Sequence, residues 1–251
     1  MIVYEFPFNE STRTWLRLEL LFARLNEMRQ RETALDHHYA LSTLFEVLEV
    51  ASRSDLKSEL LQELERQRRQ LAALRGNPAV AGGVLEETLQ AVEAAAQQLN
   101  QTQGKIGLAL AGHEWLMAVR SRIAIPGGTC SFDLPAYHAW QHGDPQRRQQ
   151  DLQGWTEALA PWAHATTAVL GLLRGSGSTQ ALTTTAGRFQ HSLNNLRPPQ
   201  LARLSLTAAT PWVPEISGNR LLLVIRMLRM DTQGHLQPCQ DDTPFQLTLC
   251  G

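Results

Sequence analysis

The stretch IPGGTCSFDLPAYHAW, residues 125–140, contains the residue types from which hydrolytic sites are built. Cys130 or Ser131 can serve as a nucleophile, with His138 as the base that activates it. A serine nucleophile usually sits in a strained G-x-S-x-G turn, and a reactive cysteine at a helix N-terminus, but the stretch offers neither. CSFDLP is instead typical of a short strand leading into a turn, with Cys130 and Phe132 buried in the core. A small hydrolase or transferase is therefore the alternative interpretation, not the preferred one.

Other catalytic and metal-binding patterns are weak. No G-x-G-x-x-G lies between a strand and a helix, and no phosphate-binding G-x-x-x-x-G-K-[ST] occurs, so we expect no nucleotide cofactor. His37 and His38 are adjacent, so on a helix their side chains point about 100° apart. His138 and His142 can share one helix face, but no acidic or cysteine ligand stands at a matching spacing. We therefore expect neither a metal site nor a cofactor.

Composition excludes several classes of protein. With 251 residues and 43% hydrophobic content, the chain can bury a core of its own. Its formal net charge of −1 gives no overall positive field to attract nucleic acid or an anionic membrane, so we expect neither partner. Of the 23 basic residues, only Lys57 and Lys105 are lysines. This excess of arginine favours carboxylate recognition through the planar guanidinium, although a GC-rich genome produces the same bias.

The start of the chain, MIVYEFPFNEST, has neither the basic segment nor the apolar segment of a secretory signal. No run of about 18 apolar residues occurs that would span a bilayer. The three cysteines are widely spaced, which fits a reducing compartment. We therefore expect a soluble, cytoplasmic protein.

Helical periodicity dominates the first two thirds of the chain. In the first helix, apolar residues recur at i, i+3, i+7 and i+10 from Trp15, and Ser11 or Thr12 can cap the N-terminus. Residues 2–8, which precede it, are short, aromatic and β-branched, as is typical of a strand. Further helices are expected at residues 34–52, 54–75, 84–101, 105–125, 145–160 and 161–174, with another beginning near Pro135.

The helical periodicity ends at the flexible segment RGSGSTQ, residues 174–180. Short segments rich in Thr, Leu and Val follow, separated by Gly, Pro and Asp, which is typical of strands. These strands are expected at residues 181–193, 201–208, 218–231 and 243–250. The isolated first strand can be satisfied only by pairing with them. The predicted fold class is therefore α+β, with an α-helical domain, residues 9–176, inserted into an antiparallel β domain, residues 1–8 and 177–251.

Six blocks stand in order along essentially the whole chain: NESTRTWLRLELLF, SELLQELERQRRQL, RSRIAIPGGTCSFDLPAYHAW, LARLSL, PEISGNRLLLVIRM and FQLTLC. Together they resemble the ZapD family, the Z-ring-associated protein D of γ- and β-proteobacteria. IPGGTCSFDLPAYHAW is the most specific of them. The resemblance implies a helical domain joined to a β domain, in agreement with the fold predicted from the residues themselves.

The same resemblance implies a cell-division function without catalysis. It implies a cytosolic homodimer that binds the C-terminal tail of the tubulin-like division GTPase FtsZ and bundles FtsZ filaments at the midcell Z-ring. A dimer carries two copies of one tail site, so it can hold two filaments, and weak sites gain strength on polymers dense in tails. The tail is short, flexible and partly acidic, so arginines bordering an apolar groove are its expected receptor.

The resemblance also implies which basic residues bind the tail. The expected residues are Arg53, Arg203 and Arg226, with Arg120, Arg122 and Arg220 as further candidates. The sequence departs from the family pattern at one place. The strand after ISG reads RLLLVIR, with leucines where a relative can carry a further basic residue, so Arg220 is an alternative position for that charge. For each arginine singly, the alternative is a surface salt bridge or an edge residue that covers apolar surface.

Overall fold

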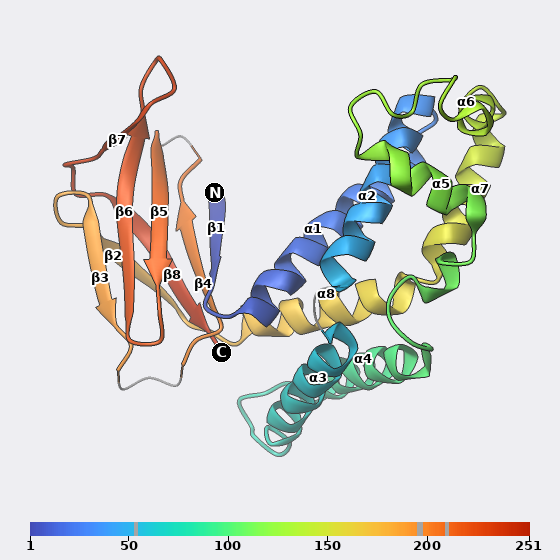
Figure 1. The fold of residues 1–251 in the computed structure, drawn as a ribbon. Coiled ribbons are helices and arrows are strands. Elements are labelled where there is room, and N and C mark those ends of the chain that lie inside the picture. Colours follow the sequence, from blue (N-terminus) through green and yellow to red (C-terminus); the bar gives the residue numbers. More distant parts are fainter. Residues whose placement is uncertain (53–54, 195–197, 209–210) are drawn as a thin grey trace. The chain divides into compact units, whose positions relative to one another are not determined.

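The computed structural model describes residues 1–52, 55–194, 198–208 and 211–251. The chain divides into two compact units. Met1–Arg13 and Leu170–Gly251 form one, here called the sandwich unit, and Thr14–Val169 form the other, here called the helical unit. Helices α1 (Glu10–Gln30) and α8 (Ala160–Gly175) carry the chain between them (Figure 1). The predicted α+β fold class is confirmed.

The helical unit contains most of the helices that the periodicity predicts. Besides α1 and α8, its described elements are α2 (Ala34–Ser52), α3 (Leu56–Ala72), α4 (Gly82–Gln101), a 3-10 helix η1 (Leu108–Leu110), α5 (Glu114–Ile123), α6 (Pro135–Gln141) and α7 (Pro145–Glu157). The predicted apolar face of α1 is confirmed, because Trp15, Leu18 and Leu25 are buried. Buried residues surround most of the circumference of α2, as expected for a helix inside a bundle.

The prediction of one helix over residues 105–125 is wrong in its first half. Gly104 and Gly107 adopt left-handed backbone angles, with φ of 67° and 76°, and these interrupt a regular helix. Helix α5 begins only at Glu114, where the Nδ1 atom of His113 accepts the N–H of Leu116 at 3.3 Å. The capped N-terminus of α5 therefore follows the turns at Gly104 and Gly107.

The predicted strand in CSFDLP is also wrong. Residues 129–133 form successive turns, in which the N–H groups of Asp133 and Leu134 donate to the carbonyl oxygen of Cys130 at 3.0 and 2.9 Å. Phe132 is 81% exposed and Cys130 is exposed, so neither belongs to the core. The described part of the helical unit contains no strand with which this segment can pair.

The sandwich unit consists of two antiparallel sheets. Its strands are β1 (Ile2–Pro7), β2 (Thr179–Thr183), β3 (Arg188–Ser192), β4 (Leu201–Leu206), β5 (Trp212–Gly218), β6 (Leu222–Met230), β7 (Leu236–Pro238) and β8 (Pro244–Cys250). Sheet A has the order β1-β4-β8-β2, and sheet B has the order β3-β6-β5, with β7 also paired to β6 (Figure 1). The prediction that the first strand pairs with the later ones is confirmed, because β1 lies antiparallel to β4.

Two strands were not predicted, and one predicted strand is two. Residues 181–193 turn at Ala186 and Gly187, both with positive φ, so β2 joins sheet A and β3 joins sheet B. Strands β5 and β7 contain Pro214 and Pro238, which weaken the strand pattern. Pro214 is tolerated because β5 is an edge strand of sheet B.

The inner faces of the two sheets form the core of the sandwich unit. The buried residues of this core are Leu193, Ala202, Leu204, Leu206, Leu223, Ile225, Met227, Cys239, Phe245 and Leu247. Since side chains alternate along a strand, Arg203 of β4 and Arg226 of β6 point away from this core. They therefore lie on opposite outer faces of the sandwich.

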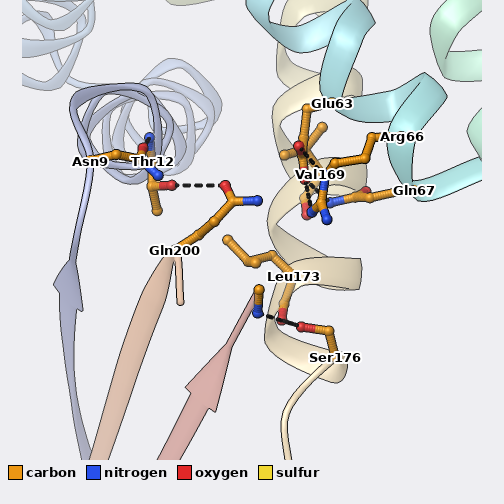
Figure 2. Close-up of polar contacts among 10 residues, drawn as sticks. Asn9, Thr12, Glu63, Arg66, Gln67, Val169, Leu173, Ser176 and Gln200 are labelled. Atoms are coloured by element: carbon orange, nitrogen blue, oxygen red, sulfur yellow. Dashed lines mark hydrogen bonds and ion pairs between the residues drawn. The ribbon is translucent and has the colours of Figure 1, made fainter. Parts of the chain in front are cut away.

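Side-chain caps fix the helix ends that enter the sandwich unit. The Oδ1 atom of Asn9 accepts the N–H of Thr12 at 2.7 Å, so Asn9 caps α1 and the prediction of Ser11 or Thr12 is wrong. The hydroxyl of buried Thr12 instead donates to Oε1 of Gln200 at 3.4 Å, as Figure 2 shows. At the end of α8, the hydroxyl of Ser176 donates to the carbonyl of Leu173 at 2.7 Å.

Within the helical unit, a buried polar contact ties α3 to α8 (Figure 2). The Nε2 group of Gln67 donates to the carbonyl oxygen of Val169 at 3.1 Å and to Glu63 at 2.8 Å. Arg66 pairs with the same Glu63, which is only 8% exposed. Glu63 therefore takes part in the packing of α3, although most charged residues of this helix are exposed or partly exposed.

Candidate functional site

The six arginines expected to bind a partner divide between the two units. Arg203, Arg220 and Arg226 belong to the sandwich unit, and Arg120 and Arg122 to the helical unit. Arg53 lies outside the described residues.

Arg203 takes part in a three-membered ionic cluster on the outer face of sheet A. Its Nε atom lies 3.0 Å from Oε1 of Glu5, which stands directly opposite on β1. Arg174, from the end of α8, binds the same carboxylate through Nε and Nη2 at 2.8 and 2.9 Å. The side chain of Glu5 is 19% exposed. One carboxylate thus holds the end of α8 and two strands of sheet A together.

The acidity of Glu5 reflects this cluster. Burial alone raises the pKa of the Glu5 carboxyl, but the hydrogen bonds and positive charges of Arg174 and Arg203 outweigh burial. The pKa of Glu5 is consequently lowered from its ordinary value. Glu5 remains charged at neutral pH, and it engages Arg203 within the protein itself.

Arg226 lies in a different setting on the outer face of sheet B. Arg188 of β3 and Glu215 of β5 stand opposite it on the two neighbouring strands, so the three residues form one row across the sheet. The Nη1 atom of Arg226 is 3.5 Å from Oε2 of Glu215, and the two side chains are 61% and 56% exposed. An exposed pair at this distance contributes little to stability. Arg226 can therefore exchange Glu215 for another carboxylate at small cost.

Apolar side chains flank Arg226 on the same face. The outward positions of β6 on either side of it are Leu222, Val224, Leu228 and Met230. Met230 stands opposite Leu236 of β7, and these two side chains are 55% and 47% exposed. We call this surface, formed by the row of Arg188, Arg226 and Glu215 with the apolar residues just named and Leu236, the β6 face. It offers both charge and apolar area to a partner.

Arg220 lies in the turn between β5 and β6. The turn is set by Asn219, whose Oδ1 accepts the N–H groups of Leu221 and Leu222 at 2.8 and 3.1 Å. Arg220 is exposed and has no ion pair with any residue that the structure describes. Its guanidinium is available at the end of β6 where the β6 face begins.

The two arginines of α5 lie near the helix C-terminus. Arg122 pairs with Asp133 at 3.5 Å, with 47% of its side chain exposed. Arg120 is exposed and makes no ion pair with a described residue. Cations at this end of a helix are favoured by the helix dipole, which gives both residues a structural reason to be here.

The alternative catalytic group is not assembled. No hydrogen bond joins Cys130 or Ser131 to His138 among the described residues. His138 instead lies beside His142, with ring centroids 4.3 Å apart. The described residues contain no group of three or more His, Cys, Asp or Glu side chains that could hold a metal ion. The arrangement of these side chains supports neither the hydrolase interpretation nor a zinc site.

No described helix has the length and apolar character needed to cross a bilayer. The β6 face combines exposed charged groups with exposed apolar area, as surfaces that recognise a protein partner do. Sequence reasoning had missed two of its features, Arg188 beside Arg226 and the pairing with Glu215. The strand register alone brings them together, because β3 pairs with β6 and not with β2, its neighbour in sequence.

Comparisons with known proteins agree with the resemblance in the sequence. Residues 16–226 match the ZapD family, described as a cell division protein. The chain is 48% identical over 251 residues to cell division protein ZapD of Ralstonia pickettii (strain 12J), covering 100% of this chain and 99% of that protein. It is 47% identical, with the same coverage, to cell division protein ZapD of Ralstonia nicotianae (strain ATCC BAA-1114 / GMI1000).

Proposed function

The chain belongs to the ZapD family of cell division proteins, and we propose that it binds the C-terminal tail of FtsZ and cross-links FtsZ filaments at the midcell Z-ring. It acts in the cytoplasm, as a homodimer, and without catalysis. Two tail sites on one dimer join two filaments, and the high density of tails along a filament compensates for a weak single contact. The net charge of −1 argues against nucleic acid or an anionic membrane as the partner.

The proposal rests on the charge and the exposure of the β6 face. Arg226 is exposed and only loosely paired with Glu215, so an acidic residue of the tail can take its place. The exposed side chains of Met230 and Leu236 offer apolar area beside the charge. A short flexible tail with both acidic and apolar residues matches this combination.

The remaining predicted arginines have different parts in the proposal. Arg220 extends the positive charge at the end of β6. Arg120, Arg122 and Arg53 stay predicted contributors. Arg203 is engaged by Glu5 and contributes to the tail site only if the tail displaces that carboxylate. We therefore assign the main contact to Arg226.

A peptide titration tests the proposal directly. The purified full chain is titrated with a peptide copy of the host FtsZ C-terminal tail while its mass in solution is measured. We expect a dimer that binds the peptide, with an affinity that falls as salt is added, because the contact is exposed and charged. A peptide in which the acidic residues are replaced by their amides is the matched control and should bind more weakly. A monomer that binds neither peptide would overturn both halves of the proposal.

A further inference from the structure

An arginine is buried in the helical unit without a carboxylate partner. Arg148 of α7 is 4% exposed, and no described carboxylate pairs with it. Its guanidinium donates instead to backbone carbonyls: to Glu32 at 2.9 Å, to Gln141 at 3.0 Å and to Gly143. A buried cation is costly unless its donors are satisfied, so these carbonyls fix its position.

A fourth donor of Arg148 determines the state of a buried histidine. Its Nε atom donates to Nδ1 of His37 at 2.9 Å, and His37 is fully buried. Because arginine can only donate, Nδ1 of His37 must carry no hydrogen. The other ring nitrogen, Nε2, lies 2.7 Å from the carbonyl oxygen of Arg31 and therefore carries the hydrogen. The arrangement requires a neutral ring with one defined tautomer.

Arg148 and His37 together join two turns that are far apart in the sequence. The carbonyls of residues 31 and 32 belong to the turn between α1 and α2, and those of residues 141 and 143 to the last residue of α6 and the turn that follows it. Gln149 adds a further contact, because its Nε2 donates to the carbonyl oxygens of Gln30 and Arg31 at 3.2 and 3.0 Å. The guanidinium is the centre of this connection.

A proton on His37 disrupts the connection in two ways. Nδ1 becomes a donor that faces the donor Nε of Arg148, and two positive charges meet inside the unit. On its own helix, Asp36 acts in the opposite sense, but its carboxylate is already engaged by Thr33 and Arg31. The other facing groups are the neutral ring of Trp140 from α6, 6.2 Å away, and the guanidinium of Arg31, which pairs with Glu27 and Asp36.

We propose that His37 and Arg148 form a proton-sensitive latch: neutral His37 holds the α6–α7 turn against the α1–α2 turn, and its protonation releases the two turns. Burial, followed by the charge of Arg148, lowers the pKa of His37 from its ordinary value of 6.5, against the opposing effects of the Arg31 carbonyl and Asp36. The open form therefore binds more protons than the closed form. The closed form is fully favoured above pH 6.5 and loses this stabilisation as the pH falls through the pKa of the latched ring.

Hydrogen exchange of the full chain tests the latch. If one proton is taken up on opening, the opening equilibrium for residues 141–149 rises by up to about tenfold per pH unit as the pH falls from 6.5 to the lower pKa of the latched ring, after correction for intrinsic exchange, and it levels off below that pKa. His37→Asn places an acceptor that cannot be protonated where Nδ1 stands, so this dependence should disappear. The carbonyl of Arg31 keeps its bond from Gln149 in that variant. His113→Asn is the matched control: it changes an exposed helix cap to another good cap and should keep the wild-type dependence.

A second measurement on the wild-type protein does not depend on how well a variant folds. Nitrogen-15 NMR of the imidazole should show His37 as the Nε2–H tautomer, with a titration midpoint below 6.5. Residue-specific assignment separates it from His38, whose pKa is also lowered by burial and whose Nδ1 meets the hydroxyl of Tyr137 instead. Nδ1 protonated at neutral pH, or exchange in residues 141–149 that does not follow the His37 titration, would overturn the latch.

Discussion

The two outer faces of the sandwich unit use arginine in opposite ways. On sheet A, Arg203 and Arg174 converge on Glu5, and the three side chains are between 19% and 31% exposed. On sheet B, Arg226 meets Glu215 at 3.5 Å with both side chains more than half exposed. Both Arg203 and Arg226 lie at outward positions of central strands. Burial and geometry, not residue type or strand position, therefore decide whether an arginine is held within the fold or is available to a partner.

The difference has a simple energetic origin. A partly buried carboxylate held by hydrogen bonds from two arginines leaves charges unpaired when one partner is removed, and unpaired charges away from water are costly. An exposed pair is screened by water and salt, so its loss costs little. The sheet A cluster should therefore govern stability, and the β6 face should govern binding.

Removing the charge of Glu5 should give the largest effect on stability. Glu5→Gln leaves Arg174 and Arg203 without their carboxylate, so we expect the free energy of unfolding to fall by about 2 kcal/mol. Thermal and urea unfolding at pH 7.5 measure it. The matched control is Glu215→Gln, which removes the exposed carboxylate on the other face and should change stability by less than about 0.5 kcal/mol. Equal losses in the two variants would remove the distinction between the faces.

Reversing charge at the two arginines should separate binding from folding. We expect Arg226→Glu to weaken binding of the FtsZ tail peptide at least tenfold, which is about 1.4 kcal/mol, while thermal unfolding stays unchanged. Arg203→Glu should show the reverse, a lower melting temperature with a smaller loss of binding, because the introduced carboxylate repels the carboxylate of Glu5. Co-sedimentation with FtsZ filaments gives the second readout of binding.

Arg229→Glu is the control for that experiment. Arg229 is exposed on the same strand, but alternation places it on the opposite side of β6 from Arg226. The same change of charge there should leave peptide binding close to that of the wild type. If Arg229→Glu weakens binding as much as Arg226→Glu does, net charge and not the β6 face controls recognition.

The elements that sequence reasoning predicted are those whose information is local. The helix over residues 34–52 matches α2, and the apolar spacing from Trp15 correctly located the buried face of α1. Strand β5 escaped prediction because Pro214 is acceptable only at a sheet edge, and edge position is a property of the whole sheet. The strand prediction for CSFDLP failed for the converse reason. The alternation of its side chains is a local signal, but no strand in the described helical unit pairs with it.

The candidate site depends even more on contacts between residues that are distant in the sequence. Composition and resemblance gave the arginines but not their partners. Glu5 and Arg203 are 198 residues apart in the sequence, and only the β1–β4 register places them opposite each other. Arg188 lies beside Arg226 because β3 pairs with β6 in sheet B, although β2 is the strand that precedes β3 in the sequence. Charge on a sequence therefore predicts a class of partner, but the register determines which charges remain available.

Acid should weaken the sheet A cluster while the protein is still folded. The pKa of Glu5 is lowered below its ordinary value of 4.5, so the folded state binds fewer protons there than the unfolded state. Its stabilisation is fully present above pH 4.5 and is lost as the pH falls through the pKa of the folded state. We expect the difference in melting temperature between the wild type and Glu5→Gln to shrink in this range. A difference that stays constant down to the acid limit of folding would mean that Glu5 stabilises the unit without its charge.

The smallest expected effect concerns Glu215, which competes with the proposed tail for Arg226. Glu215→Gln removes that competitor, so the tail peptide should bind about twofold to threefold more tightly, in keeping with the small energy of an exposed ion pair. Titrations of the wild type and the variant at low and at moderate salt measure it, and the gain should shrink as salt screens the lost pair. A weaker affinity in the variant would mean that Glu215 positions Arg226 instead of competing for it. That result would make the sheet B row a preorganised receptor and bring it closer in kind to the Glu5 cluster on sheet A.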